Sequence, residues 1–219
     1  MNRAIVLTSF DDVRSRDVRL LEEASRSGAV HVLLESDMAV ERRTGAPPRF
    51  PMAERRYLAE AIRWVAAVIE TDDPVARRSV PELATDERDV WVMPAMEATE
   101  NRHAFAASHG LALREVSEAA LHRVPAAAET VGVAAPSPGR SVLASGCYDW
   151  LHSGHVRFFE EAAELGALHV TVGNDSSVAA FKGAGHPMFP AAERRYMVGA
   201  VRHVHEALIA TGTGWLDAA

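Results

Sequence analysis

This chain of 219 residues has little cysteine, few aromatic side chains, a deficit of positive charge and no long apolar run. Its single cysteine, Cys147, cannot form a disulfide within the chain, which favours a reducing compartment and predicts a cytoplasmic protein. No apolar stretch approaches the ~18 residues that a membrane-spanning helix needs, so we expect no membrane contact. With 23 Lys and Arg against 30 Asp and Glu, the formal net charge of −7 argues against nucleic acid as a partner.

The chain does have enough apolar residues for a sizeable core, since 48% of its residues are hydrophobic. In the first half, short apolar stretches alternate with helical patterns. Strands are expected at 4–8, 30–34, 65–69, 89–93 and 111–116, and helices at 17–25, 52–64 and 100–109. This alternation predicts right-handed βαβ units and therefore an α/β fold with a doubly wound parallel sheet.

The most informative segment is 146–155, which reads Gly-Cys-Tyr-Asp-Trp-Leu-His-Ser-Gly-His. An apolar stretch precedes it and a helical pattern follows it, so His152 and His155 come where a strand passes into a helix. The first turn of a helix has unpaired N–H groups and the positive end of the helix dipole, and both favour bound phosphate. Gly154, between the histidines, allows the backbone to approach a ligand closely. The pattern therefore predicts a phosphate-handling site whose histidines donate hydrogen bonds.

This segment resembles the G-x-[FY]-D-x-x-H-x-G-H signature of the cytidylyltransferase-like branch of the nucleotidyltransferase superfamily. Further matches follow at compatible spacing over about residues 141–217. They are Leu165-Gly166, a second strand at 169–173 that ends in Asn174-Asp175, Lys182-Gly183 in an expected loop, Pro190, and Glu193-Arg194 at the start of another helix. The resemblance implies a Rossmann-like nucleotidyltransferase-type fold.

In the family that the chain resembles, a nucleoside triphosphate reacts with a phosphorylated alcohol, sugar or polyol, and pyrophosphate is released. The resemblance implies His152, His155 and Lys182 as catalytic residues and Mg²⁺ as the ion that accompanies CTP or ATP. It favours transfer of CMP over AMP, and it identifies no direct metal ligand in the protein. The implied nucleotide-binding residues are Gly146, Cys147, Tyr148, Asp149, Gly154 and Arg194, and the residues expected at the acceptor pocket are Asp175 and Trp215.

The first half of the chain repeats the second. Residues 15–24 match 153–162 at an offset of 138, and residues 50–57 match 189–196 at an offset of 139. We therefore expect a degenerate domain at 1–123, a Pro- and Ala-rich linker at 124–140, and a motif-bearing domain at 141–219. The second domain is expected to be shortened at its C-terminal end, because the Ser/Thr-rich signature of complete family members is missing.

The two copies differ where the chemistry is expected. Where the second copy has His152, Gly154, His155 and Lys182, the first has Arg14, Arg16, Asp17 and Thr44. The first copy is therefore expected to be structural or regulatory. Asp149, Asp175 and Arg194 have the identical counterparts Asp11, Asp37 and Arg55, so a structural role for them stays open.

Two questions stay open at this point. The alternative to an enzyme is a non-catalytic nucleotide-binding or assembly protein of the same fold. The tandem copies are expected to pair as an internal pseudo-dimer, because a tandem copy supplies the partner at high effective concentration. A homo-oligomer is a further option.

Overall fold

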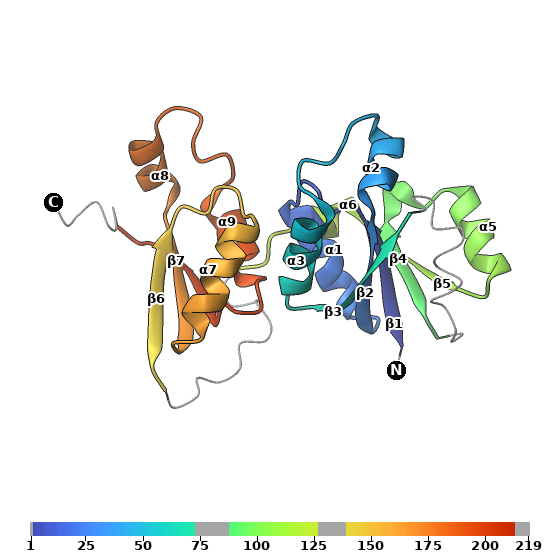
Figure 1. The fold of residues 1–219 in the computed structure, drawn as a ribbon, viewed down its shortest axis with the longest axis horizontal. Coiled ribbons are helices and arrows are strands. Elements are labelled where there is room, and N and C mark those ends of the chain that lie inside the picture. The colour runs from blue at the N-terminus through green and yellow to red at the C-terminus, as the bar shows by residue number, and fades with distance from the viewer. Residues whose placement is uncertain (1, 73–87, 127–138, 213–219) are drawn as a thin grey trace. The chain divides into compact units, whose positions relative to one another are not determined.

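The computed structural model describes residues 2–72, 88–126 and 139–212. The chain divides into two units, Met1–Arg123 and Val124–Ala219. Each unit is an α/β structure on a wholly parallel sheet, so the predicted fold class is confirmed (Figure 1). Within the predicted linker, residues 127–138 lie outside the described residues.

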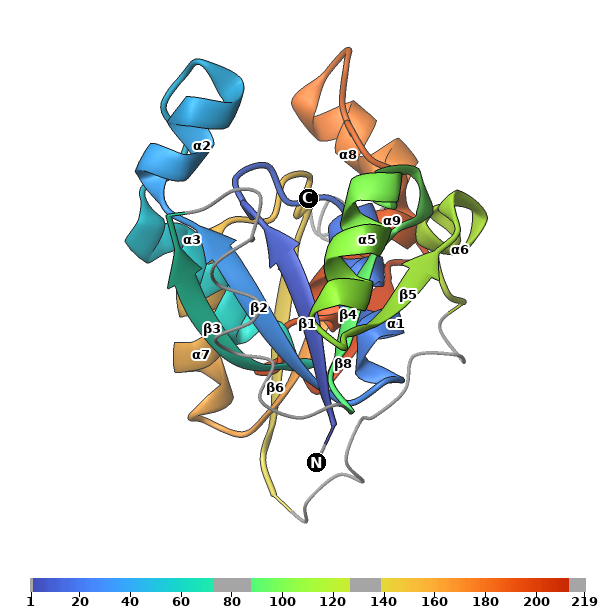
Figure 2. The same ribbon diagram turned by 90° about the vertical axis from the view of Figure 1, so that its right-hand side faces the viewer.

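The first unit has a five-stranded sheet in the order β3-β2-β1-β4-β5, and Figure 2 shows these strands side by side. The strands are β1 (Arg3–Thr8), β2 (Ala29–Glu35), β3 (Val65–Thr71), β4 (Val90–Pro94) and β5 (Ala112–Val116). All four neighbouring pairs are parallel. Each of the five predicted strands is therefore present, and the order places β1 at the centre.

Helices cover both faces of this sheet. They are α1 (Ser15–Ser25), α2 (Asp37–Thr44), α3 (Met52–Ala61), α5 (Glu100–Ser108) and α6 (Glu118–His122), with a short 3₁₀ helix at Ala95–Glu97. Figure 1 shows α1 and α3 on one face and α5 on the other. On the α5 side, Ile5, Leu33, Trp91 and Met93 pack into one buried cluster with Ala106 of α5 and Leu111.

Three details of the first unit differ from the expected helices. Helix α3 ends at Ala61 rather than at 64, because Ile62 takes an extended conformation with φ −72° and ψ 127°. Helices α2 and α6 were not expected. The hydroxyls of Ser36 and Ser117 accept hydrogen bonds from Ala39 and Ala120 and cap these two short helices, which is the usual role of serine at a helix start.

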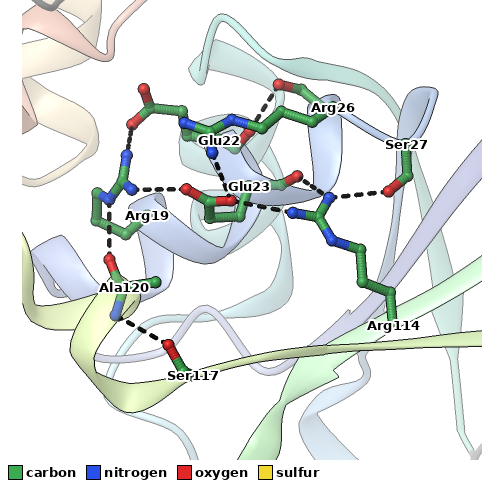
Figure 3. Close-up of polar contacts among 9 residues, drawn as sticks. Arg19, Glu22, Glu23, Arg26, Ser27, Arg114, Ser117 and Ala120 are labelled. Carbon is green, nitrogen blue, oxygen red and sulfur yellow. Dashed lines mark hydrogen bonds and ion pairs between the residues drawn. The ribbon is translucent and has the colours of Figure 1, made fainter.

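A charged cluster fastens α1 to β5 and α6 (Figure 3). The Arg19 side chain is only 3% exposed and forms ion pairs with Glu22 and Glu23. Its Nε donates to the carbonyl of Ala120, while Arg114 of β5 donates to the second oxygen of Glu23 at 3.0 Å. Because every buried charge has an opposite partner, the cluster is tolerated between the elements.

The second unit has a three-stranded parallel sheet in the order β6-β7-β8. The strands are β6 (Ser141–Gly146), β7 (Ala167–Val172) and β8 (Glu206–Ile209), and the helices are α7 (Ser153–Ala163), α8 (Asp175–Lys182) and α9 (Ala191–Gly199). Helices α7 and α9 lie on one side of this sheet (Figure 1). Leu143 of β6 is 71% exposed.

The two sheets share one register. Arg3 pairs with Ala29 and Ser141 pairs with Ala167, so both partners move by the same 138 residues. The turn before the second strand is also the same. A Cβ on Gly28 would lie 2.2 Å from the carbonyl oxygen of Asn2, and a Cβ on Gly166 would lie 2.0 Å from that of Arg140. Only glycine fits so close a backbone contact, and the agreement supports the predicted repeat.

Among the helices of the described residues, none combines the length and apolar character that crossing a membrane requires.

Candidate functional site

The two motif histidines lie at the start of α7, directly after the carboxyl end of β6. His152 is the N-cap residue and His155 is the third residue of the helix. The Nδ1 atom of His152 accepts a hydrogen bond from the amide of Gly154 at 3.1 Å, and Nδ1 of His155 accepts one from the amide of His152 at 3.4 Å. The two rings stack with their centroids 4.0 Å apart. The structure therefore brings both predicted catalytic histidines together.

These contacts determine which ring nitrogen carries the proton. A backbone N–H can only donate, so each Nδ1 must be the acceptor. A neutral imidazole that accepts at Nδ1 carries its proton on Nε2. Both rings therefore offer an Nε2–H donor beside the N-terminal end of a helix, which is the arrangement that a phosphoryl oxygen needs.

Gly154 and Gly146 make room for neighbouring rings. A Cβ on Gly154 would lie 2.9 Å from Cε1 of His152, so the imidazole occupies the space that any other residue would fill. A Cβ on Gly146 would lie 2.7 Å from Cζ of Tyr148. Both predicted nucleotide-binding glycines thus allow the site's aromatic rings to pack against the backbone.

Tyr148 packs against the ring of His155. Tyr148 is buried and has a positive φ of 47°, and its ring meets His155 edge to face at a centroid distance of 5.3 Å. Burial raises the pKa of Tyr148 to about 12, so its hydroxyl stays protonated. Burial, assisted by the charges of His152 and Lys182, lowers the pKa of His155 to about 4. His155 is therefore neutral near pH 7, in agreement with a tautomer that carries its proton on Nε2.

Asp149 is buried and connects the strand end to the loop before α9. Its Oδ1 accepts hydrogen bonds from the amides of Met188 at 2.7 Å and Phe189 at 3.3 Å, and its Oδ2 lies 2.6 Å from Nδ1 of His186. Burial raises the pKa of Asp149, but the hydrogen bonds from His186 and the two amides outweigh it and leave the pKa below its usual value. Asp149 is therefore a carboxylate at neutral pH.

Lys182 is the last residue of α8, so its expected position in a loop is corrected. The helix continues to Lys182 and ends there because Gly183 follows with φ 86°, a conformation that glycine adopts readily. The lysine is exposed. Its charge lowers the pKa of both His155 and Asp149, so it belongs to the same electrostatic neighbourhood.

Arg194 is only 1% exposed, and its guanidinium is used within the protein. Nε donates to the carbonyl of Phe189 at 2.8 Å, Nη1 to the carbonyl of Cys147 at 2.6 Å and Nη2 to Asp175 at 2.7 Å. Asp175 also accepts from the amide of Ala191. Cys147 is half-buried.

The same network is present in the first unit, where the histidines are missing. There Arg55 donates to the carbonyls of Phe50 and Ser9 and to Asp37, and Asp37 accepts from the amide of Met52. A network that persists without the histidines serves the fold. It favours a structural role for Arg194 and Asp175 over direct contact with the nucleotide or acceptor.

Trp215 lies outside the described residues. In the part of the chain that the structure describes, no group of three His, Cys, Asp or Glu side chains is arranged to hold a metal ion. His186 was not singled out in the sequence, although a signal existed: the residue at its position in the first copy is Pro47.

Comparisons with known proteins agree with the motif. The cytidylyltransferase-like family matches residues 143–214. The bifunctional protein HldE of Methylococcus capsulatus is 46% identical over 66 residues, which are 30% of this chain and 14% of that protein. HldE of Alkalilimnicola ehrlichii is 30% identical over 196 residues, 81% of this chain and 39% of that protein. The chain thus spans well under half the length of these relatives.

A solved structure, the lipopolysaccharide core biosynthesis protein of Thermoplasma volcanium, has a TM-score of 0.43 and 17% identity, covering 53% of this chain and 95% of its own. The family match includes the whole of the segment with the paired histidines at the start of α7. The second unit of this chain therefore contains a cytidylyltransferase-like domain at residues 143–214.

Proposed function

We propose that the second unit transfers a nucleoside monophosphate from a nucleoside triphosphate to a small phosphorylated alcohol, sugar or polyol. The observation that carries this proposal is the pair of Nε2–H donors at the start of α7, whose tautomers are set by backbone amides. The match of residues 143–214 to the cytidylyltransferase-like family supports it. CMP is the favoured group, with AMP as the close variant.

The proposed reaction needs no covalent intermediate with the protein. An oxygen of the acceptor phosphate attacks the α-phosphorus and forms a new P–O bond. The bond from the α-phosphorus to the bridging oxygen breaks, and its electron pair leaves with pyrophosphate. The protein contributes position and charge stabilisation. His152 and His155 donate to phosphoryl oxygens as negative charge builds up, and Lys182 provides a mobile cation nearby.

Mg²⁺ enters this proposal as part of the triphosphate substrate. Mg²⁺ is commonly held by substrate phosphates and water together with only one or two carboxylates. The residues suited to the charged phosphates are then Lys182 and the two histidines rather than a carboxylate cage.

The test must separate chemistry from helix capping, because both histidines also cap α7. His152→Ser keeps an N-cap oxygen and loses the distal donor. His155→Asp reproduces the first copy, where Asp17 accepts from the amide of Arg14 at 2.8 Å, and also loses the donor. We expect both variants to keep the parent's melting temperature within a few degrees. Their kcat for pyrophosphate release should fall at least roughly a hundredfold, the usual cost of one lost donor to transition-state charge.

Each triphosphate is assayed in turn against a panel of sugar and polyol phosphates. The triphosphate that gives the highest kcat/KM identifies the base, and the best acceptor identifies the second substrate. Near-parent turnover in either histidine variant would remove that histidine from the site.

A non-catalytic nucleotide-binding or assembly protein is the second candidate. It is favoured by one observation: within the described residues the sheet of the second unit has three strands, against five in the first. The two candidates differ in one measurement. A parent protein that binds a triphosphate in calorimetry and releases no pyrophosphate with any acceptor is the non-catalytic form.

A further inference from the structure

The loop before α9 uses the two oxygens of Asp149 for different tasks. Oδ1 accepts from the backbone amides of Met188 and Phe189, which closes the loop onto the end of β6. Oδ2 is paired with Nδ1 of His186 at 2.6 Å. The Asp149 side chain is 2% exposed, whereas the His186 side chain is 34% exposed. The histidine thus connects a buried carboxylate with solvent.

The first unit shows that this loop closes without a histidine. There Oδ1 of Asp11 accepts from the amide of Phe50 at 3.1 Å, which is the counterpart of the bond from Phe189 to Asp149. Pro47 occupies the position of His186, and proline has no side-chain donor. The Oδ1 contact therefore serves the fold in both units, and the Oδ2–His186 contact is an addition in the second unit.

His186, like the other residues proposed to contact phosphate, occurs in the second unit and has no identical counterpart in the first. His152, His155 and Lys182 are also present only in the second unit, while the framework carboxylates and arginines occur in both. Asp149, the partner of His186, directly follows Tyr148, and the ring of Tyr148 meets His155 at a centroid distance of 5.3 Å. The partner of His186 thus lies next to a residue that contacts a motif histidine.

The pair of His186 and Asp149 is chemically suited to binding a phosphoryl group. Donation from Nδ1 to a buried carboxylate holds the imidazole in one orientation. Nε2 is then the ring nitrogen that can donate to a ligand at the solvent side. A phosphoryl oxygen is the matching acceptor, because charge-assisted hydrogen bonds of this kind are the strong ones.

We propose that His186 binds a phosphoryl oxygen of the substrates through Nε2, and that Asp149 is its positioning residue. This inference rests on the proposed function and extends it by a residue. The phosphoryl group belongs either to the triphosphate or to the phosphorylated acceptor, and the experiment distinguishes the two.

The informative variant is His186→Asn in the full chain. Asparagine can still donate to Oδ2 of Asp149, but it has no group at the position of Nε2. Calorimetry gives the Kd of two probes, Mg²⁺-pyrophosphate for the triphosphate side and inorganic phosphate for the acceptor side. We expect an unchanged melting temperature and a Kd raised roughly tenfold or more for one probe, the usual effect of losing a hydrogen bond between charged groups. The probe that is affected identifies the source of the phosphoryl group.

The matched control is His169→Asn. His169 also pairs with a carboxylate, Glu206, at 3.1 Å, but it lies on β7 near the opposite end of the sheet. The control should leave both Kd values at the parent's level. Parent-like Kd values for both probes in His186→Asn would overturn the proposal. An equal loss in the control would overturn it too, because the effect would then not be specific to the site.

The role of Asp149 is tested by a double-mutant cycle. If Asp149 acts through His186, adding Asp149→Asn to His186→Asn should raise the affected Kd little further. Additive losses would contradict the coupling. These readouts do not need turnover, so a chain that binds pyrophosphate through His186 and transfers nothing would refute only the proposed function.

Discussion

At the residue scale, the two copies separate residues that hold the fold from residues suited to chemistry. Arg55 and Arg194 share three equivalent contacts, with two backbone carbonyls and one aspartate, and Arg55 donates in addition to the carbonyl of Glu35. Asp17 and His155 share a different task, since both accept a hydrogen bond from the N-cap amide. His155 adds a ring nitrogen that can donate, and Asp17 adds a negative charge. A single substitution thus changes the chemistry while the helix cap is kept.

His155 also makes a pH-dependent contribution to stability. A histidine in an unfolded chain has a pKa of about 6.5, whereas burial lowers the pKa of His155 to about 4. Between these values the unfolded chain binds a proton that the folded chain does not. The free energy of unfolding therefore falls as the pH decreases from about 6.5 to about 4, and this contribution is fully present only above pH 6.5.

We expect the parent to lose about 1–2 kcal/mol more than His155→Gln between pH 7.5 and pH 5, after allowance for partial exposure of the ring. Glutamine suits this capping position and does not titrate. Urea unfolding of both proteins at the two pH values measures the difference. An identical pH dependence in the two proteins would show that His155 is not held in its neutral form.

At the element scale, α1 and α7 place similar side chains in opposite environments. Arg19, Glu22 and Glu23 of α1 are buried against β5 and α6 (Figure 3). Their counterparts on α7, Arg157, Glu160 and Glu161, are exposed. The first strands of the two sheets show the same contrast in burial. Ile5 of β1 is fully buried, whereas its counterpart Leu143 of β6 is 71% exposed. Similar helix sequences thus differ in burial because the described second unit has three strands and the first has five.

This contrast predicts unequal effects of two equivalent substitutions. Arg19→Ala removes the buried ion pairs that Arg19 forms with Glu22 and Glu23, so we expect a loss of about 3 kcal/mol in the free energy of unfolding of the first unit. Arg157→Ala removes an exposed side chain and should cost less than about 0.5 kcal/mol. Melting curves should show a drop on the order of 10 °C for the first variant and little change for the second. Equal shifts would mean that burial does not distinguish the two clusters.

At the scale of the whole molecule, the chain carries two α/β units, with five strands in the first and three among the described residues of the second. The shared registers support their origin as a repeat. The sequence further predicts that the copies pair as an internal pseudo-dimer, and this stays a prediction. Packing between the copies would explain why the first unit keeps its apolar pattern without the histidines.

A protease site inserted between residues 127 and 138 of the full chain tests the pairing. After cleavage, we expect the two halves to elute together in gel filtration at micromolar concentration, because the apolar contact survives without the covalent link. The uncut protein gives the reference elution volume. Two separate peaks after complete cleavage would contradict an internal pseudo-dimer.

The sequence by itself determined the strands and most of the helices, and it placed the motif histidines where a strand passes into a helix. Apolar periodicity marks β-strands wherever both faces are buried, and the Gly146–His155 segment combines a strand end, a glycine and two histidines in a recognisable order. Short helices such as α2 and α6 are not predicted by this periodicity. Their few residues carry a weak periodic signal, and only the serine caps indicate them.

Only the tertiary structure decided how the side chains are used. The pairing of Asp149 with His186 joins residues 37 positions apart, and no local pattern indicates that contact. The commitment of Arg194 to backbone carbonyls depends likewise on three segments meeting in space. Distant segments also decide whether an arginine of these helices is buried. Arg19 is buried, whereas its counterpart Arg157 is exposed. Local sequence determines backbone conformation, whereas hydrogen-bond partners and desolvation depend on which distant segments are present to supply them.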